Sequence, residues 1–217
     1  MTHVNKMESL HVSTNIRGKQ TQIEILDNAW DLISQRGADV SIAEIARSAG
    51  VSRQNVYLHF GTRGGLLIAL VRRADQRFGI KAHFDKALEN ADPEERLKET
   101  LDAWLEFVPK IYPVASELIR LRVTDKEAAA AWEDRMADLR AWLLDLTYSL
   151  QKDNTLSDSW TAKTAADYIW AQSSVQVWGL LTNECDWVEE DAAAKMAETI
   201  ADSILRDAPE QQNPGSC

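Results

Sequence analysis

The sequence has few cysteines and no long apolar run. Cys185 and Cys217 are the only cysteines among 217 residues, so a disulfide framework is not expected. No run of about 18 apolar residues is present, and a membrane-spanning helix is therefore not expected. The first residues also lack the apolar centre of a secretory signal. These features predict a cytoplasmic protein with no membrane partner.

Groups typical of catalytic and metal sites are also scarce. The histidines His3, His11, His59 and His83 show no metal-ligand spacing. The sequence has no HExxH helix, no glycine-rich phosphate loop and no G-x-S-x-G elbow. We therefore expect no catalytic residues, no metal, no cofactor and no enzymatic activity.

Acidic residues outnumber basic residues, but unevenly along the chain. The net charge is −10, which at first sight argues against a nucleic-acid partner. Residues 1–78 hold 10 Lys and Arg against 7 Asp and Glu, whereas residues 79–217 hold 14 against 27. Phosphate binding depends on charges within a Debye length of about 8–10 Å, so the total excludes little. The asymmetry indicates two parts with different roles.

Prolines are few, and apolar residues recur with helical spacing almost throughout. No stretch alternates apolar and polar residues as a strand would. We therefore expect an all-α protein of about nine helices. The helices are expected near 21–35, 42–49, 53–60, from 66 on past 78, 93–108, 126–151, 160–184 and 189–206, with Pro109 and Pro113 delimiting a shorter piece that continues to Arg122.

Two short helices joined by the residues AGVS form the pattern of a helix-turn-helix at residues 41–60. Ser41 and Ser52 stand where N-caps are expected. The small Ala46 lets the two helices cross closely, and Gly50 permits the tight turn between them. The spacing therefore predicts a compact helix pair whose second member presents one face to solvent.

That second helix carries many hydrogen-bonding side chains. Val56 and Phe60 are expected to pack inward, which turns the polar positions outward. Arg matches guanine edges and Gln or Asn matches adenine, so such a face suits the major groove, while hydroxyls and cations at helix starts suit phosphates. The alternative is an ordinary polar helix surface. The candidate DNA contacts are Ser41, Ser52, Arg53, Gln54, Asn55, Tyr57, His59, Thr62 and Arg63.

The segment SIAEIARSAGVSRQNVYLHFGTRGGLL resembles the DNA-binding signature of the TetR family, the tetracycline-repressor-like bacterial transcriptional regulators, and the likeness covers about residues 20–70. The resemblance implies that Ser41 opens a support helix and contacts phosphate. It implies that the helix starting at Arg53 reads bases. Arg63 stands where the family usually has a lysine that touches the DNA backbone.

The sequence departs from the family pattern at Gly64-Gly65. Two glycines cost about 1 kcal/mol each relative to alanine inside a helix, so we expect the next helix to start late, near Leu66. The predicted organisation is a flexible tail at 1–19, a three-helix DNA-binding domain at 20–66, a helical ligand-binding and dimerisation domain at 67–207, and a disordered tail at 208–217.

Aromatic residues are concentrated beyond residue 100, where seven of the eight tryptophans lie. Large aromatics usually form core or interface, which is the alternative interpretation for each of them. The family resemblance implies a small-molecule pocket in this part of the chain, and Arg120 would pair with an anionic ligand if it faced inward. The candidate lining residues are Trp104, Phe107, Tyr112, Arg120, Trp142, Tyr148 and Trp170.

The last two predicted helices are apolar on more than one side. One side can face its own domain and the other then needs a partner, which fits the two-fold symmetric dimer that the resemblance implies. The alternative is an ordinary intramolecular core. The candidate interface residues are Val177, Trp178, Leu181, Met196, Ile200 and Ile204.

Taken with the resemblance, the sequence predicts a regulator, most simply a repressor. It would bind a pseudo-palindromic double-stranded DNA operator as a homodimer and be released by a small-molecule effector of unknown identity. The alternative is a helical small-molecule-binding or enzymatic protein whose helix-turn-helix no longer reads DNA.

Overall fold

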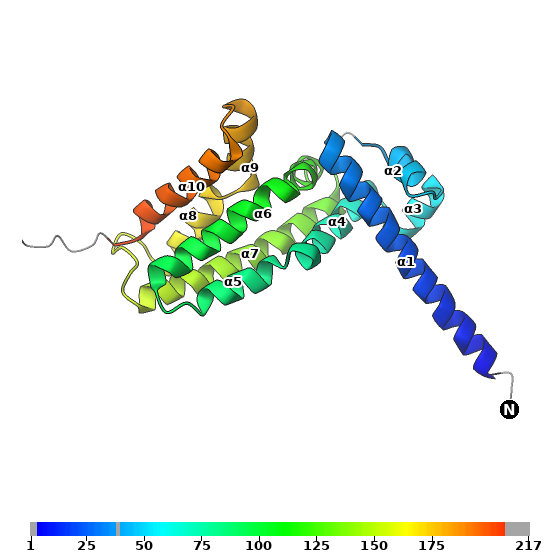
Figure 1. Cartoon of the computed structure of the whole chain (residues 1–217), viewed down its shortest axis with the longest axis horizontal. Coiled ribbons are helices and arrows are strands. Elements are labelled where there is room, and N and C mark those ends of the chain that lie inside the picture. Colours follow the sequence, from blue (N-terminus) through cyan, green and yellow to red (C-terminus); the bar gives the residue numbers. More distant parts are fainter. Residues whose placement is uncertain (1–3, 38–39, 207–217) are drawn as a thin grey trace, which may run out of the picture. The chain divides into compact units, whose positions relative to one another are not determined.

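A computed structural model describes residues 4–37 and 40–206, and these residues are almost entirely helical (Figure 1). They form helices α1 to α10 and a π-helical turn, η1. The described residues contain no sheet, and their only β pairing is an isolated antiparallel bridge between Leu156 and Leu205. None of the described helices combines the length and apolarity needed to cross a membrane. The predicted all-α fold is confirmed.

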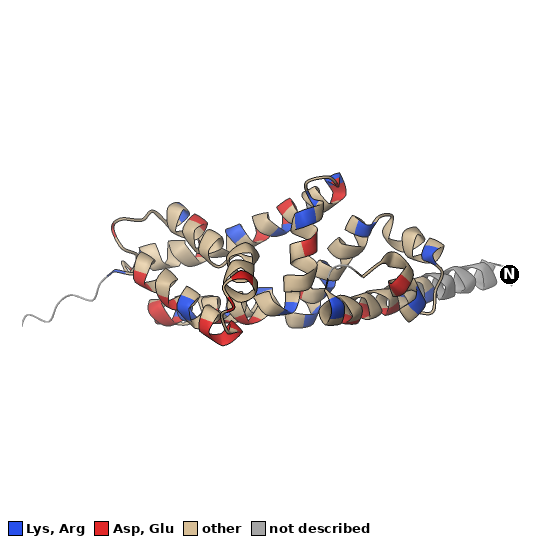
Figure 2. Ribbon diagram, turned by 90° about the horizontal axis from the view of Figure 1, so that it is seen from above, with Lys and Arg blue, Asp and Glu red and all other residues tan. Residues whose placement is uncertain are grey.

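The chain divides into two compact units. One contains the residues up to Phe78 together with Lys110–Asp134, and the other contains Gly79–Pro109 and the residues from Arg135 onward. Among residues with described side chains, the first unit has 13 basic and 10 acidic ones, whereas the second has 10 basic and 20 acidic ones. Figure 2 shows how these charges are distributed over the helices. The predicted contrast in charge therefore follows the division of the fold.

The first unit is built around α1, which packs against α2 and α4. Ile25, Ala29 and Ile33 place one face of α1 in the core. The helix begins at Val4, so the start predicted near Thr21 is wrong. The segment before Thr21 contains no proline, and a polar composition alone does not end a helix. The helices of this unit are α1 (Val4–Arg36), α2 (Ile42–Ser48), α3 (Arg53–Phe60) and α4 (Arg63–Phe78).

The helix-turn-helix is confirmed as predicted. Ser52 caps α3 by accepting a hydrogen bond from the backbone N–H of Asn55. Gly50 has a φ of 66°, which allows the turn, and the N–H of Val51 donates to the carbonyl of Ala46 across it. Local side-chain and backbone preferences therefore fix the geometry of the pair.

Helix α4 runs from Arg63 to Phe78, so the predicted late start near Leu66 and the predicted continuation past Phe78 are both wrong. Both glycines lie where a side chain has little space. A Cβ at Gly64 would lie 2.7 Å from Oδ2 of Asp125, and one at Gly65 would lie 2.0 Å from the carbonyl oxygen of Phe60. Close packing therefore explains the glycine pair, and it outweighs the helix propensity that the glycines lack.

Helix α6 runs from Pro93 to Leu121 without a break, so the predicted interruption at Pro109 and Pro113 is wrong. A proline inside a helix removes one hydrogen bond and costs about 3 kcal/mol. Buried neighbours on the same helix, including Val108 and Val114, hold it together. Helix α7 (Lys126–Lys152) matches its prediction, and both helices contribute residues to each unit.

The second unit also contains the C-terminal helices. The single helix predicted at 160–184 is wrong, because the chain breaks at Ser173 and Ser174. Ser174 caps the next helix, because its hydroxyl accepts a hydrogen bond from the N–H of Val177. The carbonyl of Ser173 accepts a hydrogen bond from Nε1 of Trp104, with 2.8 Å between the oxygen and the nitrogen. The elements are α5 (Ile80–Leu88), α8 (Ala162–Gln172), α9 (Val175–Gly179), η1 (Leu180–Glu184) and α10 (Glu189–Ile204).

Parts of the predicted tails lie outside the described residues. The C-terminal tail at 208–217 lies wholly outside them, as do residues 1–3 of the N-terminal tail. Residues 4–19 continue α1 and are helical. The remaining domain limits stay a prediction.

Candidate nucleic-acid interface

Ser41 and Glu44 form a reciprocal capping box at the start of α2. The Ser41 hydroxyl accepts from the N–H of Glu44 at 3.3 Å and donates to Oε2 of Glu44 at 2.7 Å, while the N–H of Ser41 donates to the same oxygen at 2.9 Å. Arg36 pairs with Glu44 at 2.7 Å. The backbone N–H of Ser41 is the largest cause that lowers the pKa of Glu44 to about 2. The hydroxyl predicted to bind phosphate therefore also holds the cap.

Helix α3 presents a polar face to solvent. Val56 and Phe60 are buried, as predicted. Arg53, Gln54 and Tyr57 are exposed, which fits a helix that offers these side chains to the edges of bases. The first backbone N–H groups of α3 follow the Ser52 cap, and the N-terminus of a helix is a favourable place for a phosphate.

Asn55 and His59 occupy the flanks of α3 and are only half-exposed. The Oδ1 atom of Asn55 is buried without a hydrogen-bond partner. His59 lines an open groove of about 430 Å³ among α1, α3 and α4, with Gln22 and Arg72 among the other lining residues. Their side chains are therefore less available to a partner than those of Arg53, Gln54 and Tyr57.

Leu58 was not among the sequence candidates, yet it is the most exposed apolar residue of α3, at 82%. An apolar side chain on a base-reading helix can contact thymine methyl groups. The helical period contained the signal, because residue 58 is about 200° around the helix from both Val56 and Phe60.

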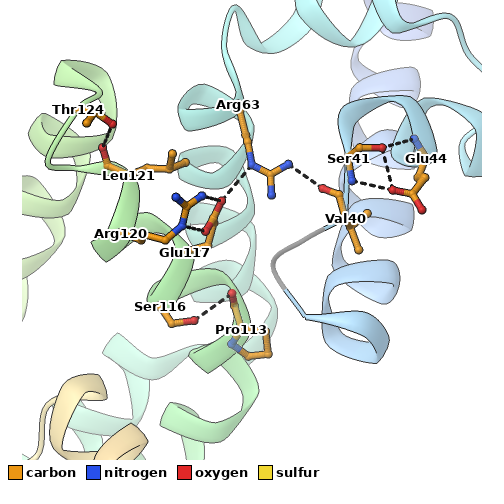
Figure 3. A network of polar contacts seen from close by, with 10 residues as sticks. All are labelled: Val40, Ser41, Glu44, Arg63, Pro113, Ser116, Glu117, Arg120, Leu121 and Thr124. Atoms are coloured by element: carbon orange, nitrogen blue, oxygen red, sulfur yellow. Dashed lines mark hydrogen bonds and ion pairs between the residues drawn. The ribbon is translucent and has the colours of Figure 1, made fainter.

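Thr62 and Arg63 are engaged by the protein itself. The Thr62 hydroxyl accepts from the N–H of Gly65 at 2.9 Å and donates to Glu127 at 3.0 Å. Arg63 donates from Nε to Oε1 of Glu117 at 3.2 Å and from Nη1 to the Val40 carbonyl at 2.6 Å (Figure 3). Their predicted phosphate contacts would have to coexist with these bonds or replace them.

Glu117 lies at the centre of this network and was not predicted. Its side chain is 4% exposed, and it also accepts two hydrogen bonds from Arg120, at 2.7 and 2.8 Å. Burial alone raises the pKa of Glu117, but the hydrogen bonds from Arg120 and Arg63 outweigh burial and the net shift is downward. The sequence did contain a signal for this role, because Glu117 is a carboxylate on the apolar face of α6, next to the buried Leu118.

The predicted ligand-lining residues are distributed over both units. Tyr112 and Arg120 belong to the first unit, where Arg120 pairs with Glu117. In the second unit, Tyr148 is exposed and Trp170 lies under the guanidinium of Arg140, 3.9 Å from its ring centroid. A ring cluster is formed by Phe84 with Trp104 and Trp142, at centroid distances of 6.5 and 5.6 Å, and by Trp104 with Phe107 at 5.9 Å.

The predicted dimer residues are mostly inside the second unit. Trp178, Met196, Ile200 and Ile204 are buried within the chain, so this part of the apolar stripe of α10 packs against its own unit. Val177 and Leu181 remain half-exposed and line an open hollow of about 220 Å³ between η1 and α10. Leu180, Trp187 and Val188 are exposed nearby along the chain. The accessible apolar surface is therefore centred on η1 and the loop that follows it.

Within the part of the chain that the structure describes, no three His, Cys, Asp or Glu side chains are grouped as a metal site would require. Cys185 is free and exposed. The polar groups that stand together are those of the helix-turn-helix and the Arg63 network.

Part of the first unit is similar to a known protein family. Residues 25–70 match the family model described as bacterial regulatory proteins, tetR family. The HTH-type transcriptional regulator BetI of Brucella canis is 33% identical over 100 residues, which cover 39% of this chain and 50% of that protein. An uncharacterized HTH-type transcriptional regulator of Mycobacterium tuberculosis is 36% identical over 85 residues, 39% of this chain and 42% of that protein. The chain thus spans about half the length of the curated relatives it matches.

Solved structures share the fold over most of the chain. A putative transcriptional regulator from Saccharomonospora viridis in complex with choline aligns with a TM-score of 0.70 and 20% identity, covering 87% of this chain and 99% of that one. NalD, the secondary repressor of the MexAB-OprM multidrug efflux pump in Pseudomonas aeruginosa, aligns with a TM-score of 0.61 and 20% identity, covering 88% and 98%.

A capped helix-turn-helix at the head of an all-α chain is the architecture of a helix-turn-helix transcriptional regulator. Over residues 25–70 the chain is similar to the TetR family of bacterial regulatory proteins, and its fold is similar to that of solved regulators over most of its length.

Proposed function

We propose that this chain is a ligand-responsive transcriptional repressor that binds a pseudo-palindromic DNA operator as a homodimer in the cytoplasm. The exposed polar face of α3 carries the proposal. Arg53, Gln54 and Tyr57 are exposed and carry donors and acceptors suited to base edges. Ser52 fixes the helix start, so the backbone N–H groups there are available to a phosphate.

Affinity and specificity would come from different groups. Ser41, Ser52 and His59 are proposed to bind phosphates and to set the register of the protein on the duplex. Arg53, Gln54 and Asn55 are proposed to discriminate between bases, with Tyr57 and Leu58 supplying aromatic and apolar contact. The net basic balance of the first unit favours this contact although the whole chain is acidic.

Dimerisation supplies the second recognition helix. Two such helices fit one duplex when their centres are about 34–36 Å apart or at a multiple of that distance. The proposed dimer surface is η1 and the following loop, where Leu180, Trp187 and Val188 expose apolar side chains. An apolar patch of this kind on a helical unit is typical of a protein–protein contact.

A small molecule is proposed to bind the second unit and release the DNA. The likeness to a choline-bound regulator and to a repressor of an efflux pump supports a small-molecule effector and a repressing role. The ring cluster of Phe84, Trp104, Phe107 and Trp142 is the proposed aromatic contact surface for such a molecule in this unit. An effector that binds one dimer geometry better than another shifts the population away from the DNA-binding one.

Selection of DNA from a random-sequence pool tests the proposal. The wild-type protein should enrich two inverted half-sites whose centres are separated by about 10 base pairs or a multiple. A variant with Arg53→Ala and Gln54→Ala should enrich no motif. If the wild type enriches no sequence at low salt, the alternative holds, namely a helical small-molecule-binding or enzymatic protein with a non-functional DNA-reading motif.

A further inference from the structure

Arg63, the first residue of α4, joins two segments that are far apart in the sequence. Its Nε donates to Glu117, a residue of α6 that is 54 positions away, at 3.2 Å. Its Nη1 donates to the carbonyl of Val40 at 2.6 Å. Val40 directly precedes Ser41, the cap of the support helix α2. One guanidinium therefore links α6 to the start of the helix-turn-helix (Figure 3).

The environment of Glu117 favours keeping Arg63 in place. The Glu117 side chain is 4% exposed, whereas Arg120, its other partner, is 69% exposed. An ion pair is stronger where water is excluded, and a buried carboxylate that loses a partner is strongly destabilised. If Arg63 turned toward a phosphate, Glu117 would keep only the partner that water screens most. A phosphate contact that drew Arg63 away from Glu117 would therefore disrupt an ion pair whose carboxylate is buried.

The residues on either side of Arg63 strengthen the same attachment. Thr62 donates to Glu127 at 3.0 Å, and Gly64 packs so closely that a Cβ there would meet Asp125 and Ala128. The start of α4 thus rests on the segment between Glu117 and Ala128.

We propose that Arg63 is a positioning residue for DNA binding, which holds the start of α2 in its reading position through Glu117 and Val40. The proposal rests on the function proposed above and revises the role that the family resemblance implies for this residue. Arg63 then acts on DNA through Ser41 and α2, and its own charge contributes little to phosphate binding. The contact between Arg63 and the α6 segment around Glu117 then determines the orientation of α2 and α3.

The salt dependence of operator binding separates a positioning role from a phosphate contact. Each lost phosphate contact lowers the slope of log K against log salt by about 0.9. For Arg63→Gln we expect binding about tenfold weaker at fixed salt, with the slope unchanged. Arg120→Gln is the matched control, because it also removes one charge from beside Glu117 but has no bond to Val40. It should bind close to wild type.

A double-mutant cycle tests whether Arg63 acts through Glu117. Glu117→Gln keeps the shape of the side chain and removes its charge, so it should weaken binding by less than Arg63→Gln. The double variant should bind no worse than Arg63→Gln alone, because the two residues belong to one link. Independent, multiplicative losses in the double variant would overturn the proposal.

Amide hydrogen exchange without DNA provides the second readout. In Arg63→Gln the amides of Glu44 and Ile45, which bond to Ser41, should exchange several-fold faster than in Arg120→Gln. The core amide of Leu70 should keep its wild-type rate, which excludes general loss of stability. A reduced salt slope with unchanged exchange would identify a phosphate contact and overturn the proposal. If the wild type bound no DNA but the exchange difference persisted, the regulator function would fail while the link from Arg63 to α2 would stand.

Discussion

Gly65 lies so close to Phe60 that a Cβ atom at position 65 would be 2.0 Å from the Phe60 carbonyl oxygen. The oxygen belongs to the backbone at the end of α3, so it cannot rotate away. We expect Gly65→Ala to lower the free energy of unfolding by about 1–3 kcal/mol, in spite of the better helix propensity of alanine. Gly18→Ala is the control, since a Cβ there meets nothing within 4 Å. It should raise stability by up to about 1 kcal/mol in urea unfolding, and a stabilising Gly65→Ala would contradict the packing described.

The capping box at α2 should make stability depend on pH. The pKa of Glu44 is lowered from 4.5 to about 2, so its charged form stabilises the fold. That contribution is complete above pH 4.5 and is lost as the pH falls toward 2. Glu44→Gln keeps the shape of the cap and lacks the charge. Urea midpoints of the two proteins should differ most at pH 7 and converge only as the pH falls to about 2, whereas a constant difference would exclude the charge as its cause.

The hydrogen bond from Trp104 Nε1 to the Ser173 carbonyl supplies a donor to a backbone oxygen at the break between α8 and α9. Both residues are buried, so Trp104→Phe would leave the Ser173 carbonyl without its donor. We expect a loss of about 1–3 kcal/mol in the free energy of unfolding. Trp160→Phe removes an equivalent bond to the Ser203 carbonyl, but Trp160 is half-exposed, so water can replace the donor. Equal losses in the two variants would show that burial of the carbonyl does not decide the cost.

Leu58 should matter for DNA and not for folding. An exposed apolar residue contributes little to stability, so Leu58→Ser should unfold within about 0.5 kcal/mol of wild type. Its affinity for the selected operator should fall several-fold in fluorescence anisotropy, with an unchanged salt slope. Val123→Ser is the matched control, because Val123 is equally exposed, at 82%, between α6 and α7. An operator affinity that does not change in Leu58→Ser would remove this residue from the reading face.

The proposed dimer surface can be tested by placing a charge on it. Leu180 is 50% exposed and lies in η1, so Leu180→Arg would bury an unpaired charge in the dimer while leaving the monomer hydrated. Light scattering after size-exclusion chromatography should give a dimer for wild type and a monomer for the variant. Val123→Arg, in the other unit, should stay dimeric. A dimeric Leu180→Arg protein would place the interface elsewhere.

The helix-turn-helix could be predicted because its determinants are local. Ser41 and Ser52 cap helices within three residues of themselves, and Gly50 forms its turn from its own φ angle. The inward and outward faces of α3 follow from the helical period. A single sequence therefore contained what was needed for this part of the site.

Other features depend on residues far apart in the sequence. The continuity of α6 through Pro109 depends on tertiary packing that no local rule contains. Arg63 has the same residue type as a phosphate contact, and only its position beside Glu117 and Val40 distinguishes the two roles. The stripe on α10 has the same pattern whether it faces its own unit or a partner, and only the packing of the chain shows that Met196, Ile200 and Ile204 are buried within the unit.

Sequence-specific, salt-dependent DNA binding through α3 is the central claim. The most direct measurement is an anisotropy titration of the selected operator and a scrambled duplex, across a salt series, with wild type and with Arg53→Ala. Wild type should prefer the operator and lose affinity steeply with salt, and Arg53→Ala should lose about 1–3 kcal/mol of discrimination at one base position. Equal binding of both duplexes, or a variant that discriminates as well as wild type, would contradict the claim.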